Sequence, residues 1–183
     1  MKELSLNILD IAQNSVKAGA KVIEITLDET DTELCISIRD DGCGMSPELL
    51  QHVKDPFTTT RTTRNVGLGI PFFTLAAEQT GGGVKVVSSQ GEGHGTTLTA
   101  HFFKNHIDFT PLGDIISTVV TLIQGSPDKD IEFAHNITGE NACRVKLSAR
   151  ELKAVLGDVK LSEPEILKWI REYLTEQYPK AVN

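Results

Sequence analysis

A helix with one apolar face, followed directly by two alternating strands, is the feature that most restricts how this chain can fold. Apolar residues recur at helical spacing from Leu4 to Val16, which predicts an amphipathic helix over residues 3–18. Apolar and polar residues then alternate over 21–27 and 33–39, and the polar turn between these runs indicates an antiparallel hairpin. Each unit has a single apolar face, so the helix and the hairpin are expected to pack together.

The same order continues further along the chain. A helix start at Ser46 and a loop rich in Thr, Arg and Gly over 55–69 precede a helix predicted over 68–80. Two more strands are predicted, over 84–89 and 96–103. This order predicts an α+β fold of two layers, an α/β sandwich in which helices cover one face of a mixed sheet.

The composition of the chain shifts near Lys104. We therefore expect one domain over residues 1–104 and a small α+β domain over 105–183, whose role the sequence leaves open. In this second segment we expect a helix at 112–124, strands at 131–136 and 143–147, and helices at 148–156 and 163–177. Trp169 and Tyr173, four residues apart on the last helix, are expected in the core.

The overall composition excludes several classes of protein. Hydrophobic residues make up 39% and charged residues 23% of the chain, as in an ordinary globular domain. The net charge of -7, without a run of Lys and Arg, argues against nucleic acid as a partner. There is no apolar run near the ~18 residues that cross a membrane, and no secretory signal pattern. The three cysteines are an odd number and lack metal-ligand spacing, which fits a reducing compartment. Together these features lead us to expect a cytoplasmic protein without a membrane partner.

Three polar residues of the first predicted helix share one face. Asp10, Asn14 and Lys17 stand at positions i, i+4 and i+7. An asparagine offers a neutral oxygen to Mg2+, a lysine neutralises phosphate oxygens, and an aspartate can hold a water. Taken alone, however, the pattern is more typical of a solvated helix face, where such charges contribute little.

A second cluster, Asp40-Asp41-Gly42-Cys43-Gly44, follows a predicted strand. Gly42 and Gly44 permit positive φ and the close approach of a flat ligand. The Asp40 carboxylate, at the strand end, can accept a hydrogen bond from an exocyclic amine such as that of adenine. An acidic glycine turn without a ligand is the alternative.

Two further glycine-rich segments come later in the chain. Gly67, Leu68 and Gly69 open a predicted helix, where free backbone N–H groups attract anions. Arg61 and Arg64 precede them and would reach bound phosphates in a closed loop; the alternative is a flexible linker with solvated arginines. The last segment, 91–97, reads by itself as a glycine-rich hairpin turn.

Together, the order and spacing of these clusters resemble the GHKL superfamily, which includes the ATP-binding domains of gyrase, the ninety-kilodalton heat-shock chaperone, histidine kinases and MutL. The resemblance covers residues 3–103. In the terms of this superfamily, the segments are the N box (10–18), the first glycine box (40–44), the phenylalanine motif (55–57), the second glycine box (67–69) and the final motif (95–96).

The resemblance implies a role for each matching residue. Asn14 is the expected Mg2+ ligand. Asp40 is expected to recognise the adenine base, and Thr96 is expected to help through a shared water. The two glycines of the first box give the base room, and the second box supplies backbone amides to the phosphates. Residues 54–66 are the expected ATP lid, so ATP and magnesium are the expected ligands.

The motifs combine features of two branches. The phenylalanine motif, the second glycine box and the segment 93–98 resemble a histidine kinase, whereas the pair Asn14-Ser15 and the segment 38–44 resemble MutL. Hydrolysing members carry Glu where this chain has Asp10, and typical histidine kinases carry an amide there. A carboxylate that is one methylene shorter leaves slow hydrolysis open, because a general base must reach its water.

The sequence leaves three functions open. The first is a stand-alone signalling kinase or ATPase that acts on a separate protein, because the N box begins close to Met1 and no histidine stands beside an acid in an amphipathic helix. The second is a non-catalytic regulatory module, in which ATP closes the lid and residues 105–183 face a partner. The third is a subunit that completes a larger ATPase in trans. A homodimer is compatible with each of these functions.

Overall fold

The computed structural model describes residues 3–54 and 68–179. Its elements are α1 (Leu4–Lys17), β1 (Val22–Glu29), β2 (Glu33–Asp40), α2 (Pro47–His52), α3 (Gly69–Gln79), β3 (Gly83–Ser89), β4 (Gly95–Phe103), α4 (Ile115–Gly125), β5 (Asp130–Ile137), β6 (Cys143–Ser148), α5 (Ala149–Leu156) and α6 (Pro164–Gln177). Each predicted helix and strand is present, with ends that differ by a few residues.

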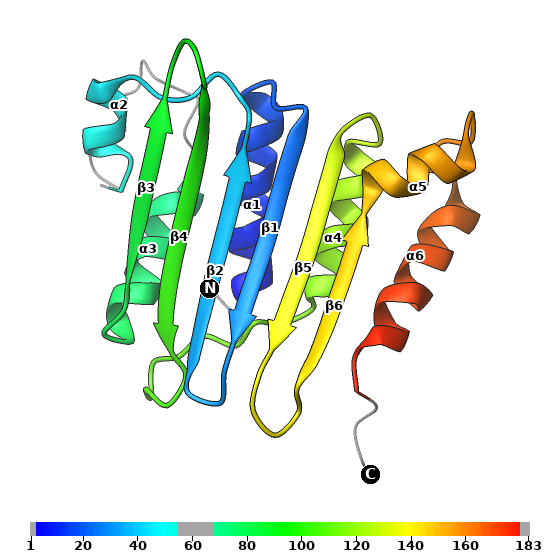
Figure 1. The fold of residues 1–183 in the computed structure, drawn as a ribbon. Coiled ribbons are helices and arrows are strands. Elements are labelled where there is room, and N and C mark those ends of the chain that lie inside the picture. Colours follow the sequence, from blue (N-terminus) through cyan, green and yellow to red (C-terminus); the bar gives the residue numbers. More distant parts are fainter. Residues whose placement is uncertain (1–2, 55–67, 180–183) are drawn as a thin grey trace.

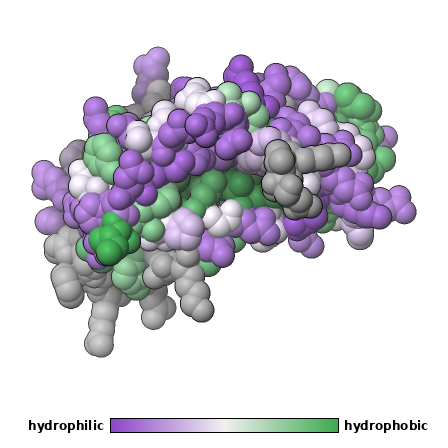
Figure 2. All heavy atoms as spheres, turned by 90° about the horizontal axis from the view of Figure 1, so that it is seen from below, coloured by the Kyte–Doolittle hydropathy of each residue, from purple (hydrophilic) through white to green (hydrophobic). Residues whose placement is uncertain are grey.

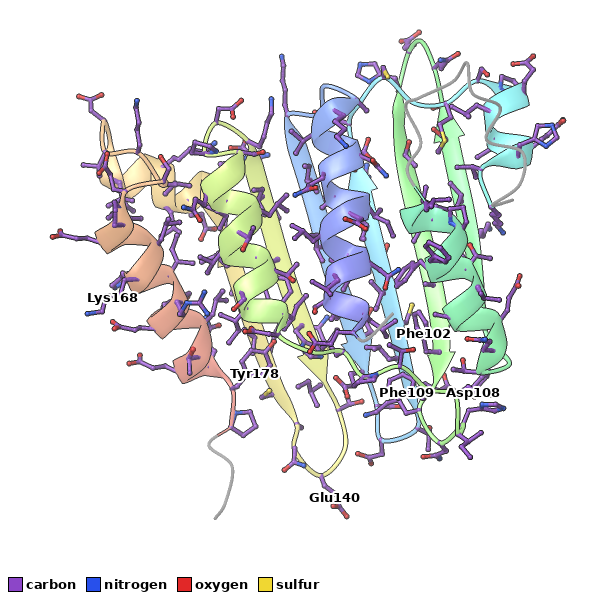
Figure 3. All side chains as sticks on the ribbon, turned by 180° about the vertical axis from the view of Figure 1, so that it is seen from behind. Phe102, Asp108, Phe109, Glu140, Lys168 and Tyr178 are labelled. Carbon is purple, nitrogen blue, oxygen red and sulfur yellow. The ribbon has the colours of Figure 1, made fainter. Side chains whose placement is uncertain are left out.

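The strands form one six-stranded sheet in the order β3-β4-β2-β1-β5-β6. Among the described strands, the β1–β5 pair is parallel, and the other four neighbouring pairs are antiparallel. Helices α1, α3, α4 and α6 lie on one side of this sheet (Figures 1 and 3). The predicted two-layer fold, a mixed sheet with helices on one face, is confirmed.

The core fills the space between the two layers, because alternate strand residues point into it. Its largest completely enclosed side chains include Ile23, Ile25 and Leu27 of β1 together with Leu34, Ile36 and Ile38 of β2. Each such side chain stabilises the fold by roughly 1.5–3 kcal/mol through burial of its apolar surface. Helix α1 therefore lies fixed along the middle of the sheet, which sets the positions of its polar residues.

The part of the chain after Lys104 extends the same sheet. Strand β5 pairs with β1 from Val22↔Asp130 to Glu29↔Ile137, and α4 packs beside α1. The buried side chains of both parts belong to one continuous core. The assignment of 1–104 and 105–183 to separate domains stays a prediction, and it divides a shared sheet.

The aromatic pair of α6 does not lie in the core. The Trp169 and Tyr173 rings stack with their centroids 5.0 Å apart, but 47% and 37% of these residues is exposed. Helix α6 buries Leu167, Ile170 and Leu174 instead. The prediction was wrong because a helix buries a single stripe, and the aliphatic stripe, not the aromatic one, faces the sheet.

The surface seen from below is mostly hydrophilic, and hydrophobic residues show mainly in a band across the middle of the molecule (Figure 2). Among residues 3–54 and 68–179, no helix has the length and hydropathy needed to cross a membrane.

Candidate functional site

A cavity of about 480 Å³ separates the polar face of α1 from the start of α3. Its walls are formed by Asp10, Gln13, Asn14 and Lys17 on one side, and by Leu68, Gly69 and Phe72 on the other. A β-carbon at Gly69 would lie 3.1 Å from the β-carbon of Asp10, so glycine lets α3 begin close to α1. The structure thus brings Asp10, Asn14, Lys17, Leu68 and Gly69 together around one cavity, and their roles stay a prediction.

A second cavity, of about 340 Å³, lies between α1 and the ends of β2 and β4. Asp40 and Thr96 line it at the sheet, and Ile38 and Leu98 form an apolar wall beside them. Asn14 and Lys17 line both cavities, so the two spaces meet at these residues. An apolar slot with a few polar groups at one end suits a flat ring with polar edges.

The Asp40 carboxylate is fixed by two donors. Its Oδ2 accepts the Ser15 hydroxyl hydrogen at 2.6 Å, and its Oδ1 accepts the Gly42 N–H at 2.9 Å. Ser15 is buried on α1, one residue after Asn14. In the sequence, Ser15 marks only the resemblance to the MutL branch, and its contact with Asp40 appears in the structure.

The first glycine box packs closely against two other segments. Gly44 has a φ of 71°, and a β-carbon there would lie 1.8 Å from the Ser89 carbonyl oxygen. A β-carbon at Gly42 would lie 2.9 Å from that of Ala18, at the end of α1. Gly44 lines the second cavity, whereas Gly42 lies outside the walls of both. The two glycines therefore permit close contact between chain segments, and Gly44 also borders the slot.

Asp41, which belongs to the first glycine box, and His94, which lies outside it, hold the box in place. Asp41 Oδ1 accepts the N–H groups of Lys21 at 2.7 Å and Val22 at 2.9 Å. Burial acts to raise the pKa of Asp41, but the backbone donors outweigh it and the pKa lies below its usual value. His94 Nδ1 lies 2.7 Å from the Gly42 carbonyl oxygen, which can only accept, so Nδ1 carries the hydrogen.

Some predicted positions lie outside the described part of the chain. These are Arg61, Arg64, Gly67, the phenylalanine motif 55–57 and the lid 54–66 apart from its first residue. Within the described residues, Lys54 donates to the Val84 carbonyl oxygen of β3. The expected start of the lid is therefore held against the sheet.

The side-chain oxygens of Asp10 and Asn14 in the larger cavity suit a magnesium ion that is bound together with phosphates. Asn14 and Asp10 stand one helical turn apart and line the same cavity. In residues 3–54 and 68–179, there is no cluster of three His, Cys, Asp or Glu residues of the kind that holds a metal ion. A site of this composition suits Mg2+, which takes one or two protein oxygens, several waters and phosphate oxygens.

Comparison with known proteins agrees with this geometry. The sequence model of the family described as histidine kinase-, DNA gyrase B-, and HSP90-like ATPase matches residues 2–134. Sensor protein SrrB of Staphylococcus aureus (strain NCTC 8325 / PS 47) is 36% identical over 98 residues, which are 51% of this chain and 17% of the sensor protein. The matched region is thus a small part of this relative.

Solved structures show the same fold. The N-terminal domain of a DNA repair protein superposes with a TM-score of 0.58 at 15% identity, over 86% of this chain and 58% of that chain. The Aquifex aeolicus MutL ATPase domain complexed with ADP gives a TM-score of 0.52 at 12% identity, over 98% and 71% of the two chains. With the family match and the paired cavities, we conclude that this chain belongs to the histidine kinase-, DNA gyrase B-, and HSP90-like ATPase family and contains a GHKL ATP-binding domain.

Proposed function

We propose that the protein binds Mg-ATP with its adenine in the cavity beside Asp40 and its phosphates in the cavity at the start of α3. The observation that carries this proposal is that Asn14 and Lys17 line both cavities. A nucleotide has a flat apolar ring and a charged phosphate chain, and it would pass these two residues where the cavities meet. Cavities of about 340 and 480 Å³ are together large enough for such a ligand.

The electrostatics of the larger cavity support a phosphate group there. Lys17 contributes a positive charge from α1. Helix α3 begins at Gly69, and its N-cap residue Leu68 makes no capping hydrogen bond through its side chain. The N–H groups of the first turn and the positive end of the helix dipole would attract an anion.

Asn14 and Asp10 would have different tasks in this cavity. The Asn14 amide oxygen would hold the magnesium ion, which when bound supplies positive charge to the phosphate oxygens. The Asp10 carboxylate would hold or activate a water, and its short side chain favours slow hydrolysis. Asp10 is thus the catalytic residue of this proposal.

A change at Asn14 tests the metal role directly. For the parent protein we expect ATP to bind more tightly with Mg2+ than with a chelator, and for Asn14→Ala we expect this difference to disappear. Asn136→Ala is a matched control, because Asn136 lies on β5 and its amide donates to Asp28 Oδ1 at 2.7 Å, outside both cavities. An unchanged magnesium dependence in Asn14→Ala would refute the assignment.

We further propose that the protein is a cytoplasmic signalling kinase or ATPase that acts on a separate protein. The similarity to a sensor protein supports a signalling role. The test is to supply ATP labelled at the γ-phosphate, with parent or Asp10→Ala protein, and to follow both released phosphate and labelled protein. If the parent releases or transfers the γ-phosphate and Asp10→Ala does not, the result supports a catalytic role of Asp10.

The second candidate is a non-catalytic module whose partner binding depends on ATP. The similarity in fold to a MutL domain complexed with ADP is compatible with it, since a bound nucleotide can order a partner surface. Tight ATP binding without phosphate release or protein labelling would favour this candidate over an enzyme.

A further inference from the structure

Three polar side chains form a row across the sheet, and two of them, Asp40 and Thr96, line the smaller cavity. Asp40 of β2 pairs in register with Thr96 of β4, and Thr96 pairs with Ser88 of β3. The next row on the same face is apolar and consists of Ile38, Leu98 and Val86. The polar row therefore ends the apolar wall where a ring would meet the sheet.

The hydrogen bonds of Ser88 fix the direction of the Thr96 hydroxyl. Ser88 Oγ accepts the Met45 N–H at 2.8 Å and donates to the Gly95 carbonyl oxygen at 3.0 Å. It also lies 2.8 Å from Thr96 Oγ1. A serine hydroxyl has a single hydrogen, and we assign it to the Gly95 oxygen, which can only accept. With this assignment, the Thr96 hydroxyl donates its own hydrogen to Ser88.

The hydrogens around Asp40 can be assigned in the same way. Its two oxygens accept from Ser15 and Gly42, and the Ser15 hydrogen is thereby used. Thr96 has given its hydrogen to Ser88, so its oxygen is left with lone pairs. The end of the slot consequently presents acceptors to a ligand, from Asp40 and from Thr96.

We infer that Ser88 is a positioning residue that keeps Thr96 an acceptor, and that it thereby favours a 6-amino purine over a 6-oxo purine. Ser88 is not among the residues that line the slot, so it acts through Thr96. This inference rests on the proposed binding of a purine nucleotide in that slot. A 6-amino group donates two hydrogens, whereas a 6-oxo group brings lone pairs against lone pairs and leaves them unpaired.

The test compares the affinities of ATP and inosine triphosphate, which carries a 6-oxo group. For the parent we expect ATP to bind more tightly, and for Ser88→Ala we expect the ratio of the two affinities to fall by about tenfold. The reason is that the Thr96 hydroxyl, without its acceptor, can turn and donate to the 6-oxo group. Ser88→Thr keeps a hydroxyl at this position and should restore the ratio.

Ser89→Ala is the matched control. Ser89 follows Ser88 on β3, and its hydroxyl donates to the Gly93 carbonyl oxygen at 3.0 Å, within the same hairpin. Its loss should leave the affinity ratio unchanged. Thr96→Val supplies an independent variant, because it removes the oriented oxygen itself and should lower the ratio even where Ser88→Ala folds poorly.

The outcomes separate the two proposals. If Ser88→Ala weakens both nucleotides equally, Ser88 is merely structural and the inference is overturned. The same conclusion follows if Thr96→Val keeps the full ratio. If the parent binds neither nucleotide, the proposed function fails and the inference fails with it. The Ser88→Ala, Thr96→Val double variant should have the same affinity ratio as Thr96→Val alone. A further fall of the ratio in the double variant would show that Ser88 does not act through Thr96.

Discussion

At the scale of single residues, the site depends on carboxylate and hydroxyl groups that are held before any ligand arrives. Asp40 is the clearest case, because Ser15 and Gly42 orient both of its oxygens. A group that is already oriented loses little freedom when it binds, so more of its interaction energy appears as affinity.

Replacement of Asp40 by asparagine should weaken ATP binding by about 1.5–3 kcal/mol, or roughly 10- to 100-fold. The amine of the base would lose a charged acceptor, and the amide cannot accept from Ser15 and Gly42 at both of its positions. Isothermal titration with ATP measures the effect. Asp108→Asn serves as the control, because Asp108 lies beyond the other end of β4 (Figure 3). Equal affinities of Asp40→Asn and parent would contradict the adenine assignment.

A second residue-scale prediction concerns Asn7 of α1. This residue is 1% exposed, and neither polar atom of its side chain has a hydrogen-bond partner in the described structure. A buried unpaired amide costs about 1–3 kcal/mol. Asn7→Leu should therefore raise the unfolding free energy by about 1 kcal/mol or more, as measured by urea titration. A loss of stability would show that the amide has a partner in solution.

Residue types and spacing could predict part of the site, but not its internal contacts. Asp10, Asn14 and Lys17 share a helix face by arithmetic alone. Glycine-rich segments include Gly44 and Gly69, which border the two cavities. Ser15 and Ser88 could not be predicted. Their partners Asp40 and Met45 lie 25 and 43 residues away, and a single serine carries no periodic signal.

At the scale of helices and strands, periodicity predicted the elements but not their order in the sheet. The antiparallel β1–β2 hairpin followed from its short turn. The parallel pairing of β1 with β5 joins segments about a hundred residues apart, and nothing in the local pattern marks it. The domain boundary at residue 104 was expected from a shift in composition. Such a shift does not show that a later strand, β5, will pair with β1.

Glu29 links three parts of this sheet and makes stability depend on pH. Its carboxylate accepts from His135 at 2.8 Å and from Lys104 at 2.6 Å. The hydrogen bond with His135, followed by the contacts with Lys104, outweighs burial and lowers the pKa of Glu29 from 4.5 to about 2. A depressed pKa stabilises the folded state above pH 4.5, and this contribution is lost as the pH falls toward 2.

Glu29→Gln should remove this acid-dependent part of the stability. We expect the parent to lose about 1–3 kcal/mol of unfolding free energy from this group between pH 4.5 and 2, and the variant to lack that share of the slope. Denaturant titrations across this pH range measure it. Glu24→Gln is the control, because Glu24 is a half-buried residue of the same strand whose carboxylate lies 3.5 Å from the Arg39 guanidinium. Parallel pH curves for parent and Glu29→Gln would contradict the role of this network.

A truncation after Lys104 tests the predicted domain boundary. The fragment 1–104 would expose the edge of β1 that pairs with β5, and the side of α1 that packs on α4. An open apolar edge of this kind favours aggregation. We expect the fragment to lack a cooperative thermal transition in circular dichroism. A transition at the temperature of the full chain would instead establish residues 1–104 as an independent domain.

At the scale of the whole molecule, the two layers gather the site from distant parts of the chain. Helix α1, the ends of β2 and β4, and the start of α3 meet around two adjoining cavities. In the proposed binding mode, the sheet supplies a polar row for the base, and the helical layer supplies Asn14, Lys17 and the start of α3 for the phosphates. The account therefore requires that the two halves of one nucleotide contact different elements.

Competition calorimetry with the separated halves of the nucleotide tests this requirement most directly. Adenosine and magnesium tripolyphosphate should each displace ATP from the parent protein. Asp40→Asn should weaken adenosine alone, and Asn14→Ala should weaken magnesium tripolyphosphate alone. If neither half competes with ATP, or if both variants weaken the same half, ATP does not lie across these two cavities.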